Sequence, residues 1–403
     1  MYWVIDKKNL LKKMFFLTFF LMCYYQIFAV FFGFDFKISS YFILCNFLLA
    51  LLIIFKGFIG KKIINVFPKF MSLYVLMLIL LILLILFYNF TLEEKFDYKG
   101  RSSITNINSF SLGVIAWSVI GAGFYLCLEN YKKINKSLII MVVFTFLVFI
   151  FAARGIVSFN YYDLNQNREF GLDHLVLGGF LIYISIYTQS LVNNYWIYPV
   201  FLLNLLILYI GGGRADLFIF FISALIYYTI FFKNKLLGVV FLCVISVSIV
   251  ILVLLNIIGL YDLKEMDRFL SIFSNTDSSG EVRGEILRTN ILDLPNKILI
   301  GNPNYFVDNY NNLGEYIHNI LSIWEFYGFI FFTIIIYVIC SNLRFLIKNR
   351  KNISENTTGR FASFGLIFVI LSILVAKSAF YYPFWFVLGF WFFYRSYYKE
   401  RVL

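Results

Sequence analysis

Apolar residues run along this chain in blocks of about twenty, separated by shorter polar stretches. A block of that length is enough to cross a bilayer as an α-helix. The pattern therefore predicts a single all-α polytopic integral membrane domain over residues 1–403, with about twelve transmembrane helices. The predicted spans are 14–32, 39–55, 70–90, 109–128, 137–152, 173–191, 196–210, 215–232, 236–258, 316–340, 361–377 and 380–394.

Composition and charge agree with this class. Hydrophobic residues make up 61% of the chain and charged residues 14%, a balance that excludes a soluble globular domain. With the N-terminus placed in the cytoplasm, the cytoplasmic side receives 21 of the 34 basic residues and four of the 22 acidic ones, as the positive-inside rule expects. Both termini are then cytoplasmic, and the net charge of +12 needs no nucleic acid partner.

Other sequence signals narrow the class. The first apolar block follows Lys12 and Lys13 and has no small-residue cleavage site, so we expect it to stay in the membrane as a span. The five cysteines lie within apolar blocks without paired spacing, which predicts neither a disulfide framework nor a zinc site. The cytoplasmic connections are short and lack a Walker-type glycine loop, which disfavours an ATP-driven pump.

Most polar residues fall in the connections on the opposite, outer side, and above all in the large loop 259–315 between the ninth and tenth spans. This loop is rich in Asn, Asp and Ser, and Tyr305 stands among several of its amides. Amides donate and accept hydrogen bonds while aromatic rings cover apolar sugar faces, so the loop suits a carbohydrate ligand. A merely solvated, Asn-rich loop is the alternative.

Four groups of residues are candidates for chemistry, and the first is the outer turn 211–216. Gly212 and Gly213 precede Arg214 at the start of a predicted span. Free backbone N–H groups, glycines that let a ligand approach and an arginine together form an anion site. The alternative is a tight turn in which Arg214 pairs with Asp216.

The second group lies around the outer loop 153–172. Arg154 stands at the outer end of its predicted span, and Arg168 and His174 follow across the loop. Basic groups at span ends are costly to desolvate, which favours a functional role. The alternatives are arginines bound to lipid headgroups and a His174 that, beside Asp173, serves as a structural cap.

The third group is the arginine pair of the large loop, Arg283 and Arg288, separated by little more than one helical turn. Arginine stays charged and binds phosphate with two parallel hydrogen bonds, which suits a diphosphate. The alternative is an amphipathic surface helix on which the arginines pair with Glu281 and Glu285 at little energetic gain.

The fourth group opens the tenth predicted span with His318 and Asn319, followed by Glu325 and Gly328. An imidazole with a near-neutral pKa at the membrane surface can take a proton from a sugar hydroxyl. Glu325 lies about two helical turns further on, on the face predicted for His318, where it can orient a partner arginine. The alternative is a hydrogen-bonded histidine at a helix start.

The order of these motifs resembles a known family. R-x-x-x-x-R, then I-G-N-P, then H-N-I-L-S-I-W-E-F-Y-G is similar to the C-terminal signature of Wzy-type O-antigen polymerases and the related O-antigen ligases. The turn 211–216 resembles the arginine turn that these families carry at the start of a mid-chain span. The likeness covers roughly residues 205–330. The chain differs at Leu287, where the family often has an aromatic residue, and at Asp216, which adds a carboxylate.

The resemblance implies a GT-C-like glycosyltransferase of the bacterial inner membrane with a periplasmic active site and without metal or cofactor. It would transfer the growing polysaccharide from undecaprenyl diphosphate, with inversion, to a hydroxyl of a lipid-linked repeat unit. A chain-length regulator is a possible partner. The implied catalytic residues are His318, Arg283, Arg214 and Glu325, and the implied substrate-binding residues are Arg154, Arg168, Arg288, Gly212, Gly213, Asn319 and Tyr305.

Two other functions stay open. An O-antigen ligase, which transfers finished polymer to lipid A core, uses the same chemistry. A lipid-linked oligosaccharide flippase belongs to another class and is expected to carry interrupted helices and ionisable groups near the bilayer midplane, often in internal repeats. In this sequence the charges collect at outer span ends and no repeat is visible, which favours the enzyme.

Overall fold

The computed structural model describes residues 7–32, 37–59, 69–128, 174–192, 197–210, 214–231, 278–297, 300–313 and 316–402. Within them the chain is almost entirely helical, and the β-structure there is one isolated bridge between Phe96 and Ser102. Five helices of this part are long and apolar enough to cross a membrane. This confirms an all-α protein of membrane character. The predicted spans 137–152 and 236–258 lie outside the described residues.

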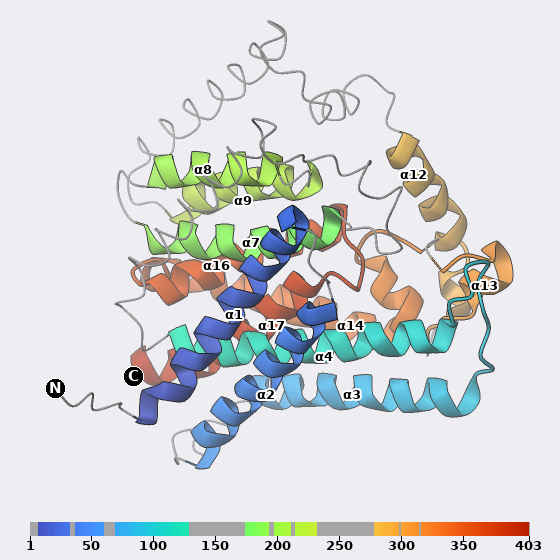
Figure 1. Cartoon of the computed structure of the whole chain (residues 1–403), viewed down its shortest axis with the longest axis horizontal. Helices are drawn as coiled ribbons and strands as arrows, with labels where there is room; N and C mark the ends of the chain where they lie inside the picture. Colours follow the sequence, from blue (N-terminus) through green and yellow to red (C-terminus); the bar gives the residue numbers. More distant parts are fainter. Residues whose placement is uncertain are drawn as a thin grey trace, which may run out of the picture.

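Each predicted span that falls on described residues overlaps a helix. The main elements are α1 (Lys7–Phe32), α2 (Lys37–Ile59), α3 (Lys69–Thr91), α4 (Ser103–Leu128), α7 (His174–Leu191), α8 (Ile197–Ile210), α9 (Arg214–Phe231), α12 (Ser278–Ile291), the 3-10 turn η3 (Leu294–Lys297), α13 (Tyr305–Tyr310), α14 (Leu321–Lys348), α15 (Arg350–Ile353), α16 (Thr357–Val375) and α17 (Tyr382–Val402). Most of the long helices lie along one axis, and α1 and α2 cross them obliquely (Figure 1).

Inner and outer helices differ in burial. Of the apolar stretches of α4 and α16, 78% is buried inside the protein, against 22% for α2 and α3. Leu48 and Phe55 on α2, and Ile79 and Leu83 on α3, are among many large apolar side chains left exposed. An exposed apolar face of this size marks contact with membrane or with another protein. We assign the exposed faces of α2 and α3 to lipid.

The central contact of the bundle joins α4 and α17 through glycines. A Cβ atom added at Gly121 would lie 1.9 Å from the carbonyl oxygen of Phe386, and one added at Gly389 would lie 1.9 Å from that of Ser118. Small residues let the backbones of membrane helices approach this closely. The indole of Trp385 donates to the carbonyl of Ala379 at 2.6 Å, so α17 also holds the connection that precedes it.

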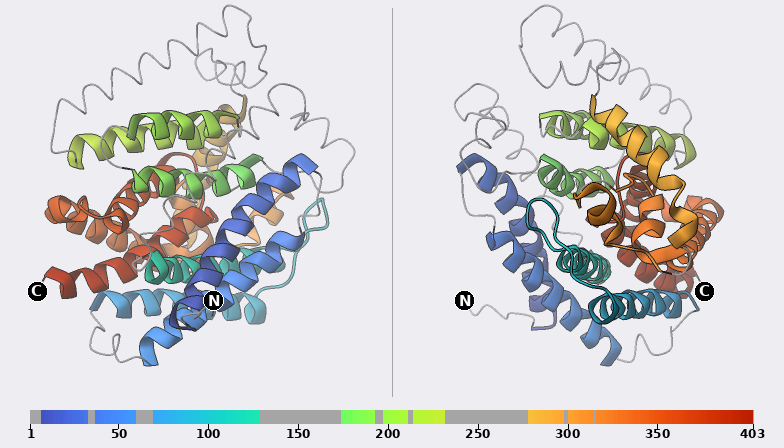
Figure 2. Two further views of the ribbon diagram at one scale, coloured as in Figure 1. Left: turned by 60° about the vertical axis from the view of Figure 1, so that its left-hand side comes forward. Right: turned by 90° about the vertical axis from the view of Figure 1, so that its right-hand side faces the viewer.

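The two ends of the bundle differ in character. The end of α2, the start of α16 and the end of α17 lie together at one end, and α12 and α13 lie at the other (Figures 1 and 2). Lys56, Arg360 and Arg395 belong to the first end. These three basic residues and the Asn-rich α13 therefore lie at opposite ends of the long axis.

Candidate functional site

A polar cap covers the end of the bundle opposite the end of α17. We define it as α12, η3, α13 and the segments 92–102 and 316–320 (Figure 2). Segment 92–102 is joined to α13 by an ion pair of 2.5 Å between Lys95 and Asp308. The backbone N–H of Tyr98 also donates to the carbonyl of Asn311 at 3.1 Å. The connection between α3 and α4 therefore supports α13, which belongs to the loop 259–315.

Local hydrogen bonds of the Asn319 and Ser322 side chains hold the start of α14. The side-chain oxygen of Asn319 accepts from the N–H of Leu321 at 2.9 Å, and the Ser322 hydroxyl donates to the Asn319 carbonyl at 2.6 Å. Such bonds satisfy orphan groups of the first turn. His318 consequently precedes the helix, and the prediction that it shares a helix face with Glu325 is wrong because residues 316–320 are not helical. Asn319 precedes the N-cap residue Ile320 and accepts from the first helical N–H, and its predicted contact with substrate stays a prediction.

Glu325 joins the parts of the cap. Its fully buried carboxylate accepts from the Asn290 side-chain amide at 3.0 Å and from the Ile317 N–H at 2.9 Å. The Tyr310 hydroxyl in turn donates to the Asn290 side-chain oxygen at 2.7 Å. One carboxylate thus connects α14 with α12, with the residue before His318 and, through Tyr310, with α13. This geometry supports a positioning role for Glu325.

Gly301 and Gly328, two glycines of the family-like motif, stand where the structure favours glycine. Gly328 interrupts α14 with φ 85° and ψ 168°, a conformation that other residues rarely adopt. The nearby Phe326 carbonyl accepts from the Tyr88 hydroxyl of α3 at 2.6 Å. Gly301 packs against the same place, since a Cβ atom there would lie 2.1 Å from the Phe326 carbonyl group. The Gly-Asn-Pro turn is therefore held directly against the broken helix.

His318 is half-buried in the cap, and its ring centroid lies 4.8 Å from that of Tyr316. Burial lowers the pKa of the imidazole, and the positive charges of Arg283 and Lys377 lower it further, to about 4. The near-neutral pKa expected from the sequence is corrected accordingly. His318 is therefore uncharged at neutral pH, so one ring nitrogen can accept a hydrogen bond or a proton.

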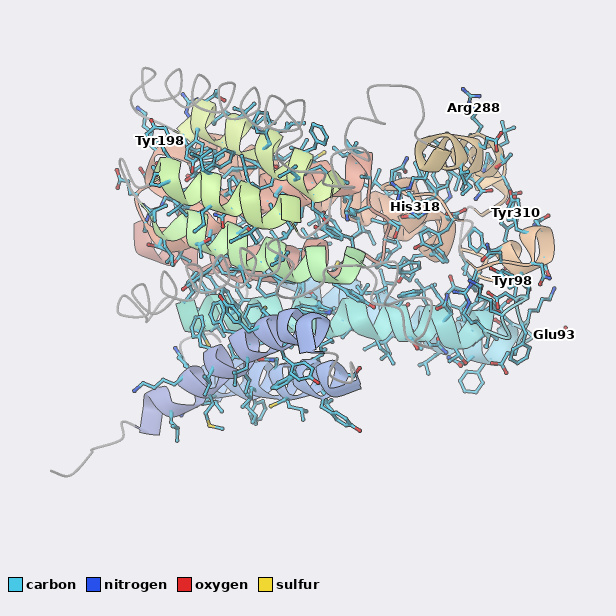
Figure 3. All side chains as sticks on the ribbon, turned by 45° about the horizontal axis from the view of Figure 1, so that its top comes forward. Glu93, Tyr98, Tyr198, Arg288, Tyr310 and His318 are labelled. Atoms are coloured by element: carbon cyan, nitrogen blue, oxygen red, sulfur yellow. The ribbon has the colours of Figure 1, made fainter. Side chains whose placement is uncertain are left out.

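The two loop arginines diverge. They are five residues apart on α12, which turns them about 140° from each other around the helix. The charge of Arg283 acts on His318. His318 lies within the cap, whereas Arg288 projects from α12 away from it (Figure 3). Of the two arginines, Arg283 is therefore the one whose charge acts on His318. Arg288 lies on the protein surface and projects away from the cap (Figure 3).

Sequence reasoning missed Lys377. Its ammonium lies 3.0 and 3.1 Å from the two carboxylate oxygens of Asp216, and the Tyr381 hydroxyl donates to the same carboxylate at 3.4 Å. The side chains of the pair are only 11% and 1% exposed. One signal was available, because Lys377 is the sole charged residue between Arg360 and Arg395. Its partner Asp216 stood out in the sequence as an added carboxylate, but no pattern linked it to Lys377.

The connection that carries Lys377 is packed against the start of α14. The N–H of Ala379 donates to the Ser322 hydroxyl at 2.6 Å. The ring of Phe380 lies 4.4 Å from that of Phe326 and 5.6 Å from that of Tyr316. The connection between α16 and α17 thus carries Lys377 to the start of α14, and the charges of Lys377 and of Arg283 on α12 both lower the pKa of His318.

The structure describes the remaining predicted site residues only in part. Arg154, Arg168, Gly212 and Gly213 lie outside the described residues, and Arg214 is described only as the first residue of α9. Tyr305 is half-buried on α13, with its ring centroid 6.1 Å from that of Tyr310. Across the described part of the chain, His, Cys, Asp and Glu form no group of three or more that could hold a metal ion.

The cap therefore combines an uncharged imidazole, two nearby cations and a buried network that fixes their supports. Such a group can bind an anion and accept a proton beside it. No protein-family model, curated protein or solved structure matches this chain.

Proposed function

We propose that this chain is a membrane glycosyltransferase that polymerises lipid-linked oligosaccharides, with the polar cap as its site. The observation that carries the proposal is the half-buried His318 in the cap, beside the start of α14 on which the connection of Lys377 packs, with a pKa that burial and the charges of Arg283 and Lys377 lower. A transfer from a lipid diphosphate needs both functions together: a group that accepts the hydroxyl proton, and cations where negative charge develops on the leaving group.

The chemistry follows from these roles. The acceptor hydroxyl oxygen attacks the anomeric carbon of the donor sugar and forms the new glycosidic bond with inversion. The bond from that carbon to undecaprenyl diphosphate breaks, and its electron pair leaves with the diphosphate. His318 takes or orients the hydroxyl proton, while Arg283 and Lys377 face the departing anion. Diphosphate is a good leaving group, so we expect the reaction to proceed without a general acid or a metal.

The bound substrate would also adjust the histidine. Burial, and after it the charges of two cations, holds the pKa of His318 down in the free protein. The negative charge of a bound diphosphate offsets them and raises that pKa, because an adjacent anion favours the imidazolium. The histidine then becomes a better proton acceptor only when the donor is in place.

The finer architecture belongs to the same proposal. It comprises about twelve spans, a GT-C-like arrangement, a bacterial inner-membrane location, cytoplasmic termini and a periplasmic cap. The basic residues at the opposite end of the bundle favour this orientation. The family-like motifs also lie on the segments that meet around His318. The lipid tails of donor and acceptor would stay in the bilayer, and a chain-length regulator would bind from outside.

Product analysis tests the proposal. Purified protein is incubated with its undecaprenyl-diphosphate repeat unit in EDTA and without lipid A core, and we expect a ladder of longer lipid-linked sugars. Transfer that appears only with polymer-loaded donor and lipid A core would make the protein a ligase and contradict polymerisation. No transfer in either assay, with lipid-linked oligosaccharide crossing the bilayer of vesicles that hold the protein, would identify a transporter instead.

A further inference from the structure

We propose that Lys377 is a phosphate-binding residue of this site and that Asp216 positions it. The ligand class is a diphosphate, such as that of a polyprenyl-linked sugar, so the inference deepens the proposed function and rests on it. Neither residue is part of the motif that resembles the polymerase signature around His318. Both reach the site through tertiary packing alone.

The ion pair leaves at least one N–H donor of Lys377 outside its contact with Asp216. The Lys377 ammonium contacts the two carboxylate oxygens of Asp216 at 3.0 and 3.1 Å. A lysine ammonium has three N–H donors, and this contact uses at most two of them. The lysine is also the more accessible partner, with 11% of its side chain exposed against 1% for the aspartate. Asp216 is thus the buried support and Lys377 the group that can meet an anion.

A purely structural role explains the pair less well. An ion pair can serve to tie α9 to the connection between α16 and α17. That connection already has other anchors, because Ala379 donates to Ser322 at 2.6 Å and accepts from the Trp385 indole at 2.6 Å. Burying a charged pair costs desolvation energy that hydrophobic packing avoids. A second role for the Lys377 charge, beyond tying the helices together, therefore accounts for the buried pair better.

The position of Lys377 near the start of α14 indicates that this second role is the binding of a phosphate group. Lys377 is held by Asp216 of α9, and its connection packs against the start of α14, whereas Arg283 belongs to a different element, α12. A diphosphate carries two phosphoryl groups, and two separate cations can each meet one of them. The hydroxyl that attacks the adjacent sugar would then lie within reach of the imidazole.

Pyrophosphate binding tests the inference on the full-length protein in detergent. Lys377→Met together with Asp216→Asn removes both charges and keeps the size of each side chain, which avoids a lone buried carboxylate. We expect this double variant to bind inorganic pyrophosphate at least roughly tenfold more weakly than wild type in calorimetric titration at low salt. Lys95→Met with Asp308→Asn is the matched control. It removes an exposed ion pair from the same cap and should leave the affinity unchanged.

The outcomes separate this inference from the proposed function. Equal pyrophosphate affinity of wild type and the Lys377/Asp216 variant would overturn the inference, as would the absence of any binding by wild type. Weaker binding by the variant, from a wild type that makes no sugar ladder, would support the anion site and contradict polymerisation. Ladders formed equally fast by both proteins would support polymerisation and overturn the role of Lys377.

Discussion

Replacing His318 with alanine is expected to abolish chain elongation while leaving the protein folded in its membrane. The side chain precedes α14 and is only half-buried, so its removal costs little packing. General acid or base catalysis typically contributes about 10²- to 10⁴-fold to a rate. Ladder formation measures the activity, and thermal unfolding followed by tryptophan fluorescence checks the fold. His318→Gln separates the two possible roles, because glutamine still accepts a hydrogen bond but is not a base.

The same residue sets the expected pH dependence. If the neutral imidazole is the working form, kcat/KM, which reports the free enzyme, should fall as the pH drops through about 4 rather than 6.5. The acid limb of kcat should lie at higher pH, because bound diphosphate raises the pKa. Between pH 6.5 and 4 the unfolded chain binds the proton more readily, so folding stability also falls over that window as the pH is lowered. A kcat/KM limb near 6.5, or full activity of His318→Ala, would remove His318 from this role.

Replacing Glu325 with leucine is expected to separate α12 from α14 and to abolish activity with it. The substitution takes away the buried acceptor of the Asn290 amide and of the Ile317 N–H. Each donor that loses a buried partner costs about 1–3 kcal/mol. The apparent melting temperature should fall, and trypsin should cleave faster at the exposed Arg288. Arg283 and His318 would lose their common support, so catalysis would fail even in molecules that stay folded.

Glutamine at position 325 provides the matched control. Rotation of the Asn290 amide allows Glu325→Gln to keep the three bonds described above, with the Tyr310 hydroxyl turning from donor to acceptor. We therefore expect this variant to stay folded and active. Asn290→Asp alone places a second carboxylate beside that of Glu325, so this variant should be less stable than wild type. Adding Glu325→Gln removes one of the two charges and should restore the stability. Inactive but folded Glu325→Gln would contradict a positioning role, because the charge itself would then be required.

Much of the fold follows from local sequence. A block of apolar residues becomes a helix in a membrane because its backbone groups must bond within the segment. Each predicted span on described residues therefore overlaps a helix, and five of the described helices are long and apolar enough to cross a membrane. The start of α14 escaped prediction by several residues. The local hydrogen bonds of Asn319 and Ser322 accompany a helix start at Leu321, after His318, although the predicted span begins at residue 316.

The candidate site was predictable only in part. His318, Arg283 and Glu325 stand in one polar segment, which is why the sequence singled them out together. Lys377 and Asp216 meet from distant helices, and no local pattern encodes such a contact. The low pKa of His318 likewise requires knowing its burial and its cationic neighbours. The partners of Glu325 emerged only from the folded cap.

The most direct measurement compares Arg283→Ala with Arg288→Ala in the ladder assay. Both arginines are exposed on α12, so the two variants share residue type, helix and expected stability. Only Arg283 places its charge on His318, while Arg288 projects away from the cap (Figure 3). The chemistry proposed for the cap predicts that Arg283→Ala loses the ladder and Arg288→Ala keeps it. Equal ladders from the two variants, or loss in Arg288→Ala alone, would contradict a catalytic site around His318.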